Sequence, residues 1–181
     1  MTVDIAITVL VLAIIVSIVA STMFTGASPV PTSKRVRATM LTALEETAGP
    51  VSGPIYELGS GWGGLARVLA ARYPDCPVRG IEISLLPWLS SALRLRLGGP
   101  ENLQFQFKDF SKIDVSDAAL VVCYLPGPAM EKLRPKLEAE LPPGALILSN
   151  TFALRGWQAI DTRTAPDMYR SQVYLYRVEK S

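Results

Sequence analysis

Apolar and polar residues along the chain follow two different periods, and their alternation predicts a sheet flanked by helices. Short apolar runs that are typical of buried strands alternate with longer stretches in which apolar residues recur every three or four positions. The expected strands are 54–58, 78–83, 103–107, 118–124, 145–149 and 172–178. The expected helices are 33–47, 63–73, 85–97 and 129–141. This order predicts an α/β fold with a doubly wound, mostly parallel sheet.

The first apolar run is longer than a strand or an ordinary globular helix requires. Residues 5–24 contain no charged residue and no proline, and a helix of about 20 residues spans roughly the 30 Å of a bilayer core. A cleaved signal peptide would have a basic start and a shorter apolar core, and a buried globular helix would show a polar stripe. We therefore expect a transmembrane helix at 1–25, a linker at 26–33 and one domain at 34–181.

Charged residues are distributed unevenly around this run. Asp4 precedes it, whereas Lys34, Arg35 and Arg37 follow it. By the positive-inside rule, this asymmetry predicts a single-pass membrane protein with its domain in the cytoplasm. All 18 Lys and Arg residues follow the apolar run, as do 15 of the 16 acidic residues, so the rest of the chain carries a net charge of about +3. This small positive excess does not indicate a nucleic-acid partner.

The absence of one residue type and the scarcity of another limit the chemistry. The chain has no histidine, which excludes Ser–His and Cys–His pairs and histidine-based metal sites, and we expect no metal. Its two cysteines, Cys76 and Cys123, fit a reducing compartment without a disulfide framework. Cys123 stands in an apolar run, which favours a position in the core over a role as a nucleophile.

Glycines gather at the first strand-to-helix turn, where ligands bind in sheets of this class. The turn reads ELGSGWGG from Glu57 to Gly64, and its glycines allow the backbone to approach a ligand closely. The expected cofactor-binding positions of the turn are Gly59, Ser60, Gly61 and Gly63. The same letters also satisfy the G-x-G-x-x-G pattern of dinucleotide-binding proteins, so the glycines alone do not identify the cofactor.

Glu57 separates the two possible cofactors. A carboxylate two residues before the first glycine would repel the pyrophosphate of NAD. S-adenosylmethionine has no phosphate and carries an α-ammonium and a sulfonium, so the same carboxylate would attract it. The alternative is a capping or solvated glutamate, but buried unpaired acids are rare in strands.

Two further turns also begin with acidic residues. Glu82 ends the second strand 19 residues after Gly63 and can accept both hydroxyls of an adenosine ribose. Asp109 follows the third strand and can accept a hydrogen bond from the adenine amino group, while Ile83 and Phe110 flank the ring. The alternative for Asp109 is an ordinary Asx turn.

The fourth turn follows the central strand, near the expected position of the transferred methyl group. Methyl transfer from a sulfonium is an in-line displacement that depends mainly on alignment, so a strong base is not required. Tyr124 is the candidate catalytic residue there, since it could position an acceptor nitrogen. Packing of Tyr124 at the end of the strand is the alternative.

These residues together resemble the FAM173-like family of membrane-anchored, seven-β-strand (class I) S-adenosylmethionine-dependent lysine methyltransferases, whose mitochondrial members modify the adenine nucleotide carrier and the ATP synthase c subunit. The matching motifs are Pro31-Thr32-Ser33, Glu57–Gly61, Gly80–Ile83, Pro87-Trp88-Leu89, Met130–Leu133 and Ser149–Phe152 running to Trp157. The resemblance implies a Rossmann-like domain and adds Thr32 to the cofactor-binding residues.

The resemblance implies methyl transfer from S-adenosylmethionine to a lysine amine, on a protein in or near a membrane. The acceptor site would then be built from the helix after the linker, the turn at 124–128 and the segment 152–169. Methylation of a lipid or quinone headgroup is an alternative within the class. From other classes, the alternatives are a membrane-tethered nucleotide-binding module and an NAD-dependent reductase, the latter disfavoured by Glu57.

Overall fold

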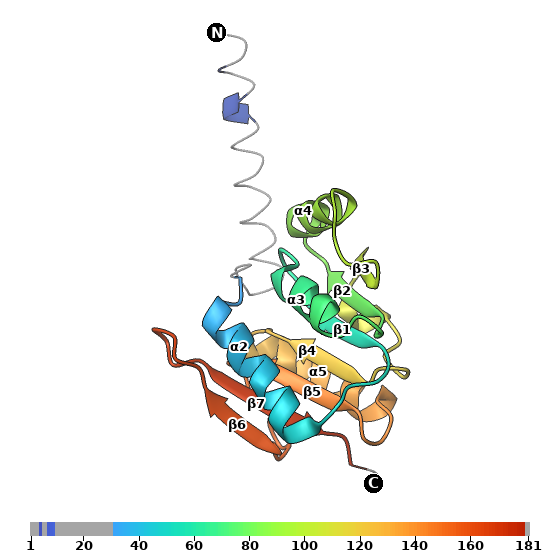
Figure 1. Cartoon of the computed structure of the whole chain (residues 1–181), viewed down its shortest axis with the longest axis vertical. Coiled ribbons are helices and arrows are strands. Elements are labelled where there is room, and N and C mark those ends of the chain that lie inside the picture. The colour runs from blue at the N-terminus through green and yellow to red at the C-terminus, as the bar shows by residue number, and fades with distance from the viewer. Residues whose placement is uncertain (1–3, 5–6, 10–30, 180–181) are drawn as a thin grey trace.

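The computed structural model describes residues 4, 7–9 and 31–179, and a seven-stranded sheet forms its centre (Figure 1). The strands are β1 Ile55–Leu58, β2 Val78–Glu82, β3 Leu103–Phe107, β4 Leu120–Cys123, β5 Leu146–Asn150, β6 Asp161–Thr164 and β7 Gln172–Arg177. Their spatial order is β3-β2-β1-β4-β5-β7-β6. Strands β1 to β5 run parallel to one another, whereas β7 is antiparallel to both β5 and β6. The predicted α/β fold with a mostly parallel sheet is confirmed.

Helices cover the two faces of the sheet unequally. They are α2 Lys34–Ala43, α3 Gly64–Arg72, α4 Leu85–Arg96 and α5 Gly127–Glu140. The first three pack on one face, where Met40 is fully buried, and α5 packs on the other through Leu133 (Figure 1). Helix α2 begins where the sequence predicts, because the Ser33 hydroxyl accepts a hydrogen bond from the Val36 amide at 3.3 Å.

The edge strand β6 is not predicted by the sequence pattern. The pattern places 172–178 at the sheet edge, and this is wrong, since β7 lies between β5 and β6. The reason is that β6 reads Asp-Thr-Arg-Thr and has no apolar alternation. Arg163 holds the strand instead, with 2.7 Å contacts to Asp161 and to Glu46 in the π-helical turn after α2. A charged edge strand of this kind discourages pairing with other chains.

The expected transmembrane helix lies almost entirely outside the described residues. Within the part of the chain that the structure describes, no helix has both the length and the apolar character to cross a bilayer. This finding overturns the prediction of a single-pass membrane protein with a cytoplasmic domain. The linker at 26–33 is described only from Pro31 onward.

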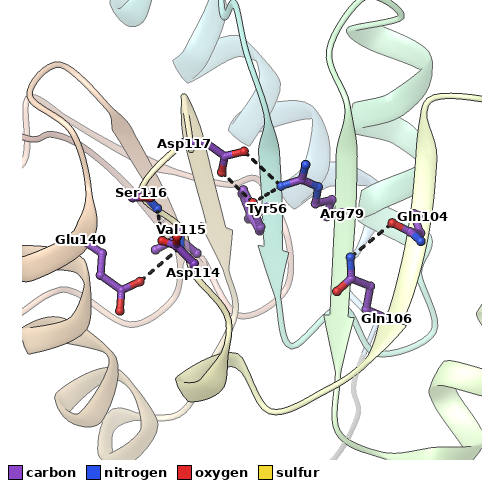
Figure 2. Close-up of polar contacts among 9 residues, drawn as sticks. All are labelled: Tyr56, Arg79, Gln104, Gln106, Asp114, Val115, Ser116, Asp117 and Glu140. Carbon is purple, nitrogen blue, oxygen red and sulfur yellow. Dashed lines mark hydrogen bonds and ion pairs between the residues drawn. The ribbon is translucent and has the colours of Figure 1, made fainter.

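A polar cluster lies at the amino ends of β1 and β2, opposite the edge that carries the glycine turn (Figure 2). The Tyr56 hydroxyl donates to Asp117 Oδ1 at 2.7 Å, and Arg79 pairs with Asp117 Oδ2 at 3.2 Å (Figure 2). Burial and the neighbouring Asp117 raise the pKa of Tyr56 to about 12, so this hydroxyl stays protonated. The connection from β3 to β4 contains one short 3₁₀ turn, Phe110–Lys112, and the cluster adds polar contacts to this thinly covered part of the sheet.

Replacing Leu133 with alanine tests the packing of α5. Leu133 is fully buried, and its truncation removes apolar contacts from the face that α5 covers. We expect a loss of about 2–5 kcal/mol in the free energy of unfolding, measured by urea denaturation. The control is Leu97→Ala, at a position that is 88% exposed, with an expected change within about 0.5 kcal/mol. Equal effects of the two substitutions would contradict this packing arrangement.

Candidate functional site

The turn after β1 is shaped by three glycines with positive φ angles. Gly59, Gly61 and Gly63 have φ values of 75°, 52° and 73°, which residues with a side chain rarely adopt. A Cβ atom on Gly59 would lie 2.7 Å from Leu125, and one on Gly63 would lie 2.5 Å from Phe105. A Cβ atom on Gly61 would meet nothing within 4 Å. Gly61 is therefore where the turn is open to a ligand.

Glu82 at the end of β2 is bound to this turn. Its Oε2 accepts a hydrogen bond from the Gly61 amide at 2.7 Å, and its Oε1 accepts one from the Ser84 amide at 2.7 Å. The amides of Gly59 and Ser60 also donate to the Ile81 carbonyl, both at 2.9 Å. The end of β2 therefore fixes the backbone of the glycine turn, and the structure brings Glu82 and Gly61, two of the predicted cofactor-binding residues, into direct contact.

Glu57 is a buried carboxyl group at the end of β1. Its exposed fraction is 6%, and burial raises its pKa to about 8, with further repulsion from Glu82. The Ala66 amide and the positive charge of Arg37 act in the opposite direction on this pKa. Among the described residues, Glu57 Oε2 and the neighbouring Ser60 hydroxyl are buried without a hydrogen-bond partner. Buried polar atoms without partners are rare, and here they fit a cationic, hydrogen-bonding ligand.

Arg37 is a residue of this site that the sequence analysis assigned only to membrane topology. It projects from α2, and its guanidinium donates to the Gly64 carbonyl at the start of α3 at 3.1 Å. It also lowers the pKa of Glu57. Because 27 positions separate Arg37 from Gly64, no local pattern could have revealed this contact.

The other expected adenosine contacts follow β2 and β3. Ile83 is 49% exposed beyond β2, and Phe110 is half-buried after β3. Asp109 accepts a hydrogen bond from the Ser111 amide at 2.9 Å, so the Asx-turn alternative describes its observed contact. Thr32 is half-buried ahead of α2. The cofactor roles of these four residues stay predictions. Within the described residues, no group of three or more acidic or cysteine side chains could hold a metal ion.

The ends of β4 and β5 carry a pair of aromatic rings. Tyr124 follows β4 and stacks on Phe152 after β5, with ring centroids 6.2 Å apart and planes inclined by 26°. Thr151, directly before Phe152, has a φ of 67°. The Phe152 amide donates to the Asn150 carbonyl at 2.8 Å, so residues 150–152 form a tight turn around Thr151. Such a three-residue turn is strained for a β-branched residue. Strain of this kind clusters at functional sites, and no sequence pattern predicts it at Thr151.

Comparison with known proteins identifies the family. The model of the ANTKMT methyltransferase domain family matches residues 57–161. A protein-lysine N-methyltransferase of Saccharolobus islandicus is 29% identical over 81% of this chain and 91% of its own length. The adenine nucleotide translocase lysine N-methyltransferase of Mus musculus is 36% identical over 60% of this chain, and the match spans about half of that protein (47%).

A solved structure agrees with this family in fold and cofactor. The crystal structure of an RNA methyltransferase from Salinibacter ruber, in complex with S-adenosyl-L-homocysteine, has a TM-score of 0.73 and 28% identity. The match covers 84% of this chain and 95% of that one. The seven-stranded sheet is thus a Rossmann-like class I methyltransferase fold, and the cofactor is S-adenosylmethionine. The chain belongs to the ANTKMT methyltransferase domain family of S-adenosylmethionine-dependent methyltransferases.

Proposed function

We propose that this protein transfers a methyl group from S-adenosylmethionine to the ε-amino group of a lysine in an acceptor protein. The observation that carries the proposal is the stacked pair Tyr124 and Phe152 at the edge where the methyl group is delivered. The relatives from Saccharolobus and mouse, both named as lysine methyltransferases, support the same acceptor chemistry.

On the cofactor side, the proposal assigns each acidic strand end to one part of S-adenosylmethionine. The buried carboxylate of Glu57 pairs with the α-ammonium, because it otherwise lacks a full set of partners. Glu82 accepts the ribose hydroxyls while it keeps the Gly61 amide in place. Ile83 and Phe110 flank the adenine ring, and Asp109 accepts its amino group through the oxygen that does not bind the Ser111 amide.

On the acceptor side, the two aromatic rings suit a lysine side chain. Aromatic faces bind aliphatic carbon chains, and they also attract ammonium groups by cation–π interaction. The rings of Tyr124 and Phe152 come from two adjacent strand ends and can hold the four-carbon stem of lysine. The turn at Thr151 fixes the position of Phe152 relative to β5.

The reaction requires little from the protein beyond alignment. The lysine amine loses its proton to solvent, and its lone pair then forms the bond to the methyl carbon. When bound, S-adenosylmethionine supplies that methyl group from its sulfonium and leaves as neutral S-adenosylhomocysteine. The protein's part is to hold the amine in line and to exclude water, which accounts for most of the rate in displacements of this kind. The lack of histidine in the sequence is compatible with this mechanism.

Two other acceptors remain as alternatives for the experiments below. RNA is one, because the Salinibacter neighbour acts on RNA. A lipid or quinone headgroup is the other, as the sequence analysis considered. The expectation that an acceptor protein lies in or near a membrane stays a prediction, and identification of that protein tests it.

Substitution of Glu57 by glutamine should separate cofactor binding from stability. Glutamine keeps the shape but cannot pair with an ammonium, so we expect the Kd for S-adenosylmethionine to rise at least about tenfold in calorimetric titration. The folded-state pKa of Glu57 is raised from 4.5 to about 8, so wild type loses stability as the pH rises through this interval. Glu57→Gln avoids this loss and should melt higher than wild type at pH 8, with a smaller difference at pH 5.

The matched control for Glu57→Gln is Glu101→Gln, at an exposed position after α4. It removes the same charge, and both its Kd and its melting temperature should equal those of wild type. Unchanged cofactor affinity in Glu57→Gln would overturn the assignment of Glu57.

The aromatic pair is tested by Tyr124→Ala and Phe152→Ala. Each should lower kcat/KM for the acceptor by about tenfold or more, because one face that holds the lysine is lost. The Kd for S-adenosylmethionine should stay within about twofold of wild type. Tyr124→Phe keeps the ring and should retain activity within about threefold. Loss of activity in Tyr124→Phe would show that the hydroxyl, rather than the ring, positions the amine.

The class of acceptor can be determined by supplying S-adenosylmethionine that carries a tritiated methyl group and following where the label goes. The full-length protein is incubated with a total cell extract, which is then separated into protein, RNA and lipid fractions. We expect the label in protein and, after acid hydrolysis, in methylated lysine. Label in the RNA or lipid fraction without methyl-lysine would contradict the proposal and select the corresponding alternative.

A further inference from the structure

The turn between β6 and β7, residues 165–171, lies at the edge of the sheet that carries the aromatic pair. Because β7 is antiparallel to both β5 and β6, the end of β6 points the same way as the end of β5. Asn150 of β5 is opposite Val173, and Thr164 of β6 is opposite Gln172, the residue before Val173 and the first of β7. In Figure 1 the turn projects from the β6–β7 pair beside the start of α2.

The β6–β7 turn is held by hydrogen bonds of its own. Asp167 accepts from the amide of Ser171 at 2.8 Å and from its hydroxyl at 2.7 Å. The Arg170 amide donates to the Asp167 carbonyl at 3.1 Å, with Arg170 at a φ of 50°. These bonds lower the pKa of Asp167 and keep it ionised at neutral pH. The Ala165 amide donates to the Ser171 carbonyl at 2.8 Å and closes the turn.

The β6–β7 turn is also connected to the elements of the acceptor edge. Arg35, at the start of α2, donates to the Pro166 carbonyl at 3.0 Å. The Thr151 amide, at the strained position next to Phe152, donates to the Gln172 carbonyl at 2.7 Å. The position of the turn is therefore fixed relative to both the first helix and the aromatic pair.

Two large side chains extend from this fixed turn into solvent. Met168 is 86% exposed and Tyr169 is 84% exposed. Aromatic residues and methionine are enriched in protein interfaces, where Tyr supplies a rigid contact surface and Met adapts to an irregular one. Since the turn is already ordered, little backbone entropy would be lost when a partner covers these side chains.

We propose that Met168 and Tyr169 form a docking knob for the acceptor protein. The knob binds the surface of that protein next to the lysine to be methylated. The proposal rests on the proposed lysine methylation and adds a contact surface outside the aromatic pair. Because the turn is joined to α2, and the residue after it to Thr151, a partner seated on the turn is next to the acceptor edge. This position favours the acceptor protein over a second copy of the chain, which would block access to that edge.

The chemistry of the knob indicates what the acceptor surface looks like. Met168 and Tyr169 require an apolar patch on the partner, and two cations lie near the knob, Arg170 in the turn and Arg35 through its hydrogen bond to the Pro166 carbonyl. An apolar patch bordered by acidic side chains, on a folded protein, would complement this arrangement. Short peptides that contain lysine lack such a surface, so their rate of methylation should not depend on Met168 and Tyr169.

The test compares folded and fragmented acceptors with the full-length protein. The probes are a native total cell extract and the same extract digested with endoproteinase Glu-C, which cleaves after acidic residues and leaves lysines within peptides. Tritiated methyl transfer into methyl-lysine is measured for wild type and for the double variant Met168→Ser, Tyr169→Ser. We expect the double variant to lose about tenfold in initial rate on the native extract and less than about twofold on the digest.

Two control variants make this comparison specific. Met168→Leu, Tyr169→Phe keeps the apolar surface and should restore the rate on the native extract to within about threefold of wild type. Leu97→Ser removes an apolar side chain that is 88% exposed directly after α4, and it should change neither rate. Calorimetric titration should show an unchanged Kd for S-adenosylmethionine in every variant.

The outcomes separate the knob from the proposed function. If wild type forms no methyl-lysine with either probe, the proposed function fails and the knob proposal fails with it. If wild type forms methyl-lysine and the serine double variant matches it on the native extract, only the docking proposal is overturned. An equal loss on both probes, or an equal loss in Leu97→Ser, would also overturn it.

Discussion

The buried carboxyl group of Glu57 is the constraint around which the cofactor site is arranged. A carboxylate removed from water is costly to ionise unless charge and hydrogen bonds compensate it. The protein supplies only part of that compensation, through the Ala66 amide and the charge of Arg37, and Glu82 works against it. In the proposed site, the α-ammonium of S-adenosylmethionine would supply the remaining compensation. Cofactor affinity is thus obtained at the expense of stability in the free protein, a common feature of binding sites.

The surrounding structure holds that carboxyl group and its neighbours in register. Parallel pairing brings Glu57, at the end of β1, next to β2, where Glu82 binds the Gly61 amide. Arg37 connects the first helix of the domain to the start of α3. These contacts join the glycine turn, two strands and two helices into one unit. The cofactor side is therefore built from regular elements, which limits its freedom to move.

The proposed acceptor side is built differently, from turns that follow β4, β5 and β6. Thr151 is strained, and its amide donates to the carbonyl of Gln172, the first residue of β7 after the turn that presents Met168 and Tyr169. Loops on a rigid scaffold can vary without loss of the fold, so this division suits a family in which the cofactor is constant and the acceptor differs.

Much of the scaffold was predictable because local chemistry determines it. Apolar runs and the Ser33 cap place the strands and α2, and the site roles of the acidic residues Glu57 and Glu82 stay predictions. Features that depend on distant contacts could not be read from the sequence. β6 has no apolar alternation and is held by Arg163, and Arg37 reaches its partner across 27 positions. The predicted single-pass location relied on the apolar run 5–24 and on the charges that flank it, and the helices that the structure describes do not support it.

Proton release on cofactor binding is the sharpest test of whether Glu57 pairs with the ammonium of S-adenosylmethionine. Because the pKa of Glu57 is about 8, the group is mostly protonated in the free protein at neutral pH, and it must ionise to pair with an ammonium. Calorimetric titration with S-adenosylmethionine at about pH 7, in two buffers of different ionisation enthalpy, counts the protons exchanged. If Glu57 ionises to pair with the ammonium, we expect the release of roughly one proton per cofactor bound. Binding without proton exchange would contradict it.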